Sequence, residues 1–379
     1  MVNQISMLSI CIGASFLVGC SSSGFFPENV AGAENPVEAA RLAAETANLP
    51  ATKIIIAPLD LSNSKMRVGE WVIREDNPGY ENQPWFVPGQ ASFYYVAQGE
   101  SGKTDIWRAD LDEGLERQQN VTVRNNEFSP RLSPDGQYLT YVQELEAGAM
   151  TRVHRLSLSD TANDNAASLG DAVFDFGPIG YYAFLDGGAK AIAYARTEPG
   201  SLMLIEVESG DALKLADNVG RGLLADPNGA RAFFTSVTQT GAHLLQSYDW
   251  RTGEIDSYFE LVDGAQDFAL LFHDDGSLKS VLSASNRQLR QRDLEDNAWT
   301  IFADYSDSDI GEISRVAVSD DEKWLAFVVA DNSVASDLLE ENLDGAPVHL
   351  THNLRSVITS RFCRLQISYL RFRQWPLHH

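Results

Sequence analysis

Three carboxylates occupy one recurring position in the sequence. Glu81, Glu127 and Asp267 each lie six residues before the first residue of a segment that predicts a tight turn. If the strands leading into these turns surround one axis, the three carboxylates meet near one mouth of a channel. Clustered carboxylates bind a cation or raise each other's pKa, and oxygen ligands favour Ca²⁺ or Mg²⁺ over zinc. The favoured interpretation is coincidence in an acidic chain, with no cofactor assigned, and a Ca²⁺ site at these residues is the alternative.

Polar and aromatic side chains flank two of these carboxylates and recur at the matching position of a third strand. They combine hydrogen-bonding groups with rings, as recognition surfaces on exposed loops often do. We expect them to share one rim of the channel with the carboxylates. These residues are Tyr80, Asn82, Gln83, Asn126, Tyr181 and Tyr182.

Other signals of catalysis are weak. No Gly-Xaa-Ser-Xaa-Gly segment, the nucleophile elbow of α/β-hydrolases, occurs in the sequence. His349 and His352 are spaced like metal ligands but lack an evident third partner. The acidic run from Asp304 to Asp309 lacks the residue order of an EF-hand loop. We therefore identify no catalytic residue.

The first 19 residues are typical of an export signal. Residues 5–18 are largely apolar, a length that fits the core of a signal peptide better than a membrane span. The following Leu17-Val18-Gly19-Cys20 resembles a bacterial lipobox. That resemblance implies lipidation of Cys20, and Ser21 after it points to the outer membrane. Because residues 1–4 contain no Lys or Arg, cleavage without lipidation and a misread start stay open.

Residues 20–51 predict a tether with one short helix. The tether begins with Ser21-Ser22-Ser23-Gly24, a flexible composition. Asn35-Pro36 then supplies an N-cap and a proline suited to the first helical position, and Pro50 ends the Ala-rich stretch.

A repeat of 40 to 53 residues fills the chain from residue 52 to residue 332. Each unit has a hairpin around a turn of the Pro-Asp-Gly kind, followed by a second pair of strands. Four strands per unit at this period are typical of a β-propeller blade. The six first turn residues are Val87, Ser133, Asp186, Asp226, His273 and Ser319.

The predicted fold is therefore an all-β, six-bladed propeller. Strand-like Ile54–Leu61 and Trp71–Ile73 form an outer pair without a hairpin before it, so they would complete the last blade after Ile313–Val329. The first blade's outer pair is expected at Asp105–Leu111 and Asn120–Thr122. Residues 336–351 resemble one outer pair too many, but no turn near residue 365 supports a seventh blade.

These repeats resemble TolB-like, WD-type propellers of bacterial envelopes. The likeness runs from about Ile54 to Ala330 and is carried by Tyr80–Pro84, Asp105–Arg108, Asn126–Pro130 and Ser133–Gly136. It implies a propeller that binds an envelope protein or peptide on the periplasmic side. TolB has an additional N-terminal α/β domain, to which nothing in this sequence corresponds.

Charge divides the chain into two unequal parts. The formal net charge is −24 and the pI about 4.6, which excludes a general nucleic-acid binder because such proteins need a basic surface. Residues 345–379 contain five Arg, four His and no Asp or Glu. Residues 333–379 are thus interpreted as an extra strand-like segment followed by an atypical basic tail. The favoured explanation of the tail is a translated frameshift or a divergent end, and the alternative is a basic docking tail.

The function that these observations favour is a non-enzymatic envelope lipoprotein whose propeller binds a protein or peptide. Two alternatives stay open. One is a metal-dependent small-ligand binder or lactonase-like propeller enzyme that uses the channel mouth. The other is a truncated relative with little activity.

Overall fold

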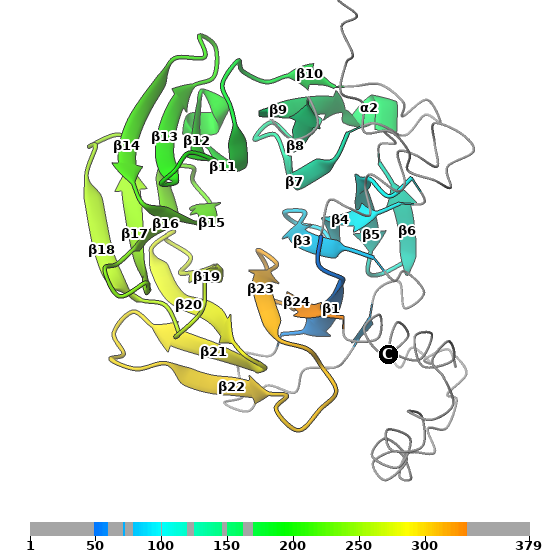
Figure 1. Ribbon diagram of the computed structural model, residues 1–379, viewed down its shortest axis with the longest axis vertical. Helices are drawn as coiled ribbons and strands as arrows, with labels where there is room; N and C mark the ends of the chain where they lie inside the picture. The colour runs from blue at the N-terminus through cyan, green and yellow to red at the C-terminus, as the bar shows by residue number, and fades with distance from the viewer. Residues whose placement is uncertain are drawn as a thin grey trace, which may run out of the picture.

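Six four-stranded antiparallel sheets surround one axis in the computed structural model (Figure 1). The structure describes residues 49–59, 71–72, 79–99, 101–119, 125–145, 150–161 and 170–331. The expected six-bladed, all-β propeller is therefore confirmed. The proposed signal peptide, Cys20, the helix after Asn35 and the segment from residue 332 onward lie outside the described residues. No helix in the described part of the chain is long and apolar enough to cross a membrane.

Each blade has the same strand order from the axis outward. The innermost strands are β3 (Glu81–Phe86), β7 (Glu127–Leu132), β11 (Ile179–Leu185), β15 (Val219–Ala225), β19 (Phe268–Phe272) and β23 (Ile313–Val318). The second strands are β4 (Ser92–Gln98), β8 (Tyr138–Leu145), β12 (Lys190–Ala195), β16 (Arg231–Val237), β20 (Leu278–Ser285) and β24 (Trp324–Ala330). The third strands are β5 (Thr104–Asp110), β9 (Met150–Ser157), β13 (Ser201–Glu206), β17 (His243–Asp249), β21 (Gln288–Asp293) and β1 (Thr52–Pro58). The outermost strands are β6 (Leu115–Gln118), β10 (Asp171–Ala172), β14 (Ala212–Asp217), β18 (Ile255–Glu260), β22 (Thr300–Asp304) and β2 (Trp71–Val72).

The first two strands of every blade meet in the turn that the sequence predicts. At each of the six predicted first turn residues, the carbonyl accepts a hydrogen bond from the N–H three residues later, over 2.8 to 3.2 Å. The turn residues Gly89, Gly136, Gly229 and Gly276 have φ between 62° and 81°, a region that L side chains rarely adopt. The turn chemistry therefore places six hairpins around the axis.

One outer strand differs from its expected position. In the first blade β6 spans Leu115–Gln118, whereas the sequence favoured Asn120–Thr122, which lie outside the described residues. The chain reverses earlier because Asp110 Oδ1 accepts the N–H groups of Asp112 and Glu113, and Gly114 then adopts φ 64°. A tight turn of this kind leaves no room for the longer loop that the prediction assumed.

The first described strand closes the ring. β1 pairs antiparallel with β24 over seven residue pairs, from Thr52 opposite Ala330 to Pro58 opposite Trp324. The predicted completion of the last blade by the N-terminal strands is thus confirmed. Alternate side chains of β1 point to opposite neighbours: Ile54 packs among Phe93 and Tyr95 of the first blade, and Ile55 joins the cluster of the β19–β22 blade.

The closing strand should be a sensitive point of the fold. Ile54 is fully buried, so Ile54→Ala should lower the free energy of unfolding by about 2–5 kcal/mol. Leu213 on β14 is 60% exposed, and Leu213→Ala is the matched control with an expected change within about 0.5 kcal/mol. Urea unfolding followed by tryptophan fluorescence measures both. Equal losses would mean that closure by β1 contributes little.

Candidate functional site

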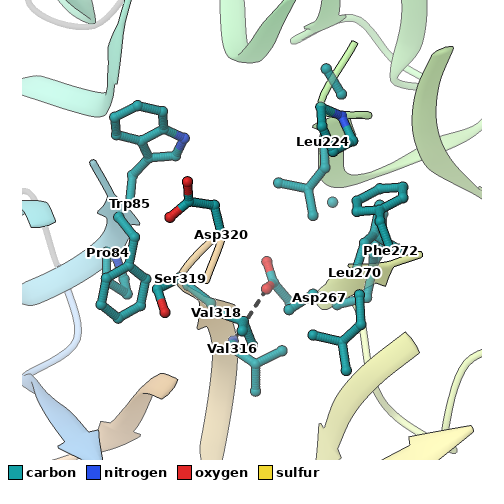
Figure 2. A pocket seen from close by; sticks show the side chains of 18 of the residues that line it. Pro84, Trp85, Leu224, Asp267, Leu270, Phe272, Val316, Val318, Ser319 and Asp320 are labelled. Carbon is teal, nitrogen blue, oxygen red and sulfur yellow. Dashed lines mark hydrogen bonds between the residues drawn. The ribbon is translucent and has the colours of Figure 1, made fainter. Parts of the chain in front are cut away.

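A cavity of about 980 Å³ lies along the axis on the side of the inner turns. Its open end, which we call the mouth, includes Pro88, Pro227 and Asp320 from three of these turns. Figure 2 shows Pro84 and Trp85 on one side of the cavity and Leu224 and Phe272 across from them, with the Asp267 carboxylate between. Apolar walls and a polar deep end are typical of binding pockets of this size.

β-Bulges shape the deep end, which we call the floor. The pairing register shifts between Asn82 and Trp85 in β3 and between Phe128 and Arg131 in β7. The same kind of shift occurs between Val219 and Leu223 in β15. A bulge adds an unpaired residue to one strand and redirects its side chains. The inner strands thereby point polar groups across the axis as well as toward the neighbouring blades.

The first part of the floor is a hydrogen-bonded chain across three blades. Gln83 Oε1 accepts the Ser129 N–H, and Gln83 Nε2 donates to the Tyr80 hydroxyl over 3.2 Å. Ser129 Oγ in turn donates to the Gly180 carbonyl over 3.1 Å. Gln83 and Ser129 both have positive φ, at 57° and 53°, a strain that such residues keep only where surrounding contacts enforce it. Burial raises the pKa of Tyr80 to about 12, so its hydroxyl stays neutral.

Arg315 is the centre of the second part. Its guanidinium donates to Asp267 Oδ2 over 3.1 Å and to the Tyr181 hydroxyl over 2.5 Å, and the Val316 N–H donates to Asp267 Oδ1 over 3.3 Å. The Arg315 and Asp267 side chains are only 11% and 13% exposed. Burial alone would lower the pKa of Arg315, but Tyr181 and Asp267 raise it above its ordinary value. Arg315 thereby joins β23 to β11 through Tyr181 and to the segment that leads into β19 through Asp267.

Two further arginines complete the floor. Arg131 on β7 donates to the Leu223 carbonyl over 3.1 Å, and its guanidinium lies 5.9 Å from the Tyr182 ring centroid. Arg221 on β15 donates to the Ser314 carbonyl over a long 3.4 Å. Burial lowers the pKa of Arg131, but a guanidinium remains protonated in proteins. The floor thus holds three cations and the Asp267 carboxylate.

The structure divides the predicted site residues into two groups. Gln83, Tyr181 and Asp267 line the cavity, and Tyr80 supports Gln83 from behind. Tyr182 instead lies in the core, where its hydroxyl donates to Thr140 Oγ1 over 2.7 Å. It lies outside the rim because neighbouring residues of a strand point to opposite faces.

Glu81, Asn82, Asn126 and Glu127 are buried between blades. A threonine of the preceding blade donates its hydroxyl to the first carbonyl of the next inner strand, and this contact occurs three times. The pairs are Thr52 with Glu81 over 2.7 Å, Thr104 with Glu127 over 3.0 Å, and Thr151 with Ile179 over 2.5 Å. Asn126 and Glu127 also bond within their own blade, to Glu144 and Gln143 respectively. The recurrence that suggested a site therefore belongs to the joints between blades.

The described structure does not bring Glu81, Glu127 and Asp267 together as the alternative of a shared Ca²⁺ site requires. Among the described residues, no group of three or more His, Cys, Asp and Glu side chains is close enough together to hold a metal ion. Two of the carboxylates lie buried in separate blade joints, while Asp267 is paired with Arg315 in the cavity. Equal sequence offsets do not give equal side-chain directions because the bulges shift the strands differently.

Sequence reasoning did not find the three arginines. Their signal was present, because Arg131, Arg221 and Arg315 lie on predicted innermost strands of a chain with 53 acidic and 29 basic residues. A cation on the innermost strand of an acidic propeller faces the axis or must be buried with a partner. That criterion would have located the floor.

Comparison with known proteins shows the fold. A protein assigned as TolB from Agrobacterium tumefaciens is similar over 75% of this chain and 99% of its own, with 15% identity and a TM-score of 0.52. The gluconolactonase XC5397 from Xanthomonas campestris matches over 75% and 97%, with 10% identity and a TM-score of 0.50. No protein-family model and no curated protein matches the sequence. The expected likeness to TolB-like propellers is thus confirmed, at the level of the fold alone.

The Arg315–Asp267 pair should stabilise the ring strongly. Arg315→Met leaves a largely buried carboxylate without its ion pair, so we expect a loss of about 3–5 kcal/mol in the free energy of unfolding. Adding Asp267→Asn should restore part of that loss, because the uncompensated charge is then gone. A double-mutant cycle from urea unfolding measures the coupling. The exposed Lys214–Asp217 pair serves as control and should show little coupling. A similar result for both pairs would contradict the assignment.

Proposed function

We propose that this protein is an envelope-anchored, non-enzymatic binding protein whose axial cavity takes a peptide segment of a protein partner. The observation that carries the proposal is the cavity itself: about 980 Å³, apolar along its walls and polar at its floor. The fold of TolB-like propellers supports a role as a binding scaffold. Residues 1–19 would serve as the signal peptide, and the lipid on Cys20 would hold the propeller on the periplasmic side, at the outer membrane.

The walls offer enough apolar surface for a peptide of moderate affinity. Fully burying one Leu or Phe side chain contributes about 1.5–3 kcal/mol. Two such side chains against Trp85, Leu270 and Phe272 would contribute about 3–6 kcal/mol, less than the roughly 8 kcal/mol of a micromolar complex. The remainder, and the cost of ordering the peptide, must come from polar contacts. The hydrogen-bonding groups of the floor can supply them.

Substitution of two cavity wall residues should weaken partner binding without unfolding the propeller. Leu270 lines the cavity and is partly exposed there, so Leu270→Ala combined with Leu224→Ala should weaken partner binding at least tenfold. Leu213→Ala on the outer strand β14 is the control and should bind like wild type. The measurement is capture from envelope fractions by the immobilised proteins, followed by quantitative mass spectrometry. A partner that binds all three proteins equally would place its interface elsewhere.

Membrane anchoring should depend on one cysteine. Cells grown with a palmitate analogue should label the wild-type protein, and Cys20→Ser should remove the label because only Cys20 follows the lipobox-like residues. Cys363→Ser is the matched control and should keep it. Fractionation should move Cys20→Ser from the membrane to the soluble fraction. Labelling of Cys20→Ser at the wild-type level would contradict lipidation at this residue.

A further inference from the structure

The charges that line the cavity are separated along its axis. The floor carries Arg131, Arg221 and Arg315 against Asp267, a balance of +2 within a chain of net charge −24. The other charged lining groups lie at the inner turns around the mouth. They are Asp274, Lys279, Asp320, Asp321 and Glu322, and His273 lies beside them. The deep end is therefore cationic, while the entrance is acidic.

Arg131 and Arg221 have donors to spare. A guanidinium has five N–H donors, yet among the described residues the Arg131 side chain donates only to the Leu223 carbonyl and the Arg221 side chain only to the Ser314 carbonyl. Their Nε atoms are buried and have no hydrogen-bond partner among the described residues. Within the same residues neither arginine forms an ion pair, in contrast to Arg315. Asp267 attracts Arg131 but is already paired with Arg315, so the cost of burying the Arg131 guanidinium is only partly offset. A bound anion at the floor would supply the missing counter-charge.

We propose that the floor is an anion subsite in which Arg131 and Arg221 bind a carboxylate of the ligand. The inference rests on the proposed function, and it names the chemistry of the bound segment: an apolar or aromatic side chain along the walls and a carboxylate at the deep end. The planar guanidinium fork fits a carboxylate with two parallel hydrogen bonds. In the same cluster Arg315 already binds a carboxylate, with one guanidinium hydrogen bond to Asp267 Oδ2.

The charge balance favours a single negative charge. Asp267 repels any second anion at the floor, and the mouth holds four carboxylates against Lys279. A dianionic phosphate doubles both these repulsions and the attraction of the arginines relative to a carboxylate, so it is the acidic mouth on the way to the floor that favours the single charge. A peptide can present the favoured group in two ways, as its free C-terminus or as an Asp or Glu side chain.

A small probe tests the subsite directly. Indole-3-propionate carries a ring for the walls and one carboxylate, and indole-3-propionamide is its neutral counterpart. Isothermal titration of the full chain should show the acid binding at least tenfold more tightly than the amide. Arg221→Gln should remove most of this difference, because it removes one of the two guanidinium groups that bind the carboxylate. The variant should stay folded, because the 3.4 Å contact of Arg221 to Ser314 is long and contributes little to the structure.

Two more variants complete the design. Arg131→Gln should act in the same direction, and Arg117→Gln is the matched control, because Arg117 is exposed on β6 and outside the cavity. Equal binding of acid and amide, or full discrimination by folded Arg221→Gln, would overturn the subsite. Thermal melts confirm that each variant is folded.

Peptide pools distinguish a C-terminal carboxylate from a side-chain carboxylate, and they test peptide binding separately from the anion subsite. Immobilised protein is offered random hexapeptides without Asp or Glu, with either a free or an amidated C-terminus, and an amidated pool in which one position is Glu. Retention of the free-acid pool alone assigns the C-terminus, and retention of the Glu pool assigns the side chain. If all pools are retained equally, peptide binding stands and the carboxylate subsite fails. If no pool is retained but the indole acid binds, the subsite stands and the peptide-binding function fails.

Discussion

The antiparallel pairing of β1 with β24 is the constraint on which the rest of the structure depends. It is the contact that joins the two ends of the repeat array, and seven residue pairs and the buried side chains of Ile54, Ile55 and Ile56 maintain it. Within a propeller each blade buries its faces against two neighbours, so an open ring would expose two apolar faces at once. The closing blade also carries Arg315, whose contacts reach β11 and the segment before β19. Closure of the ring and assembly of the floor therefore depend on the same blade.

The floor acts as a polar hub for the inner strands. Gln83 and Ser129 link β3, β7 and β11, and Arg315 links β23 to Tyr181 and Asp267. Arg131 and Arg221 reach across to β15 and β23 through backbone carbonyls. Buried polar networks of this kind favour a single arrangement when their members are satisfied. The unused donors of two arginines are then the place where a ligand can still bind.

The cavity has a cationic floor and an acidic mouth, a separation of charge that the composition does not reveal. A chain of net charge −24 repels anions on average, but fields inside a cavity depend on the nearest groups, because the low dielectric there strengthens short-range interactions. Salt screens the exposed acids at the mouth more strongly than the buried arginines at the floor. Guanidinium groups remain charged throughout the working pH range, so the positive charges of the floor do not depend on pH.

The sequence by itself determined the architecture of this protein. Turn residues with fixed φ preferences, alternating apolar residues and a period near 46 residues are local properties, so they located all six inner turns and the closing role of Ile54–Leu61. It also indicated that Gln83, Tyr181 and Asp267 lie together, although the structure places them at the floor of the cavity rather than at a rim. Only the tertiary structure decided which side chains face the axis. The bulges of β3 and β7 shift the pairing register with the second strand of each blade, and the residue pattern does not predict these shifts. They leave Glu81 and Glu127 in the blade joints, where threonines of the neighbouring blade bind their carbonyls, and they bring Arg131 to the cavity with Arg221 and Arg315. The physical reason is that a turn is encoded by adjacent residues, whereas a site at the axis combines strands from six blades far apart in the chain.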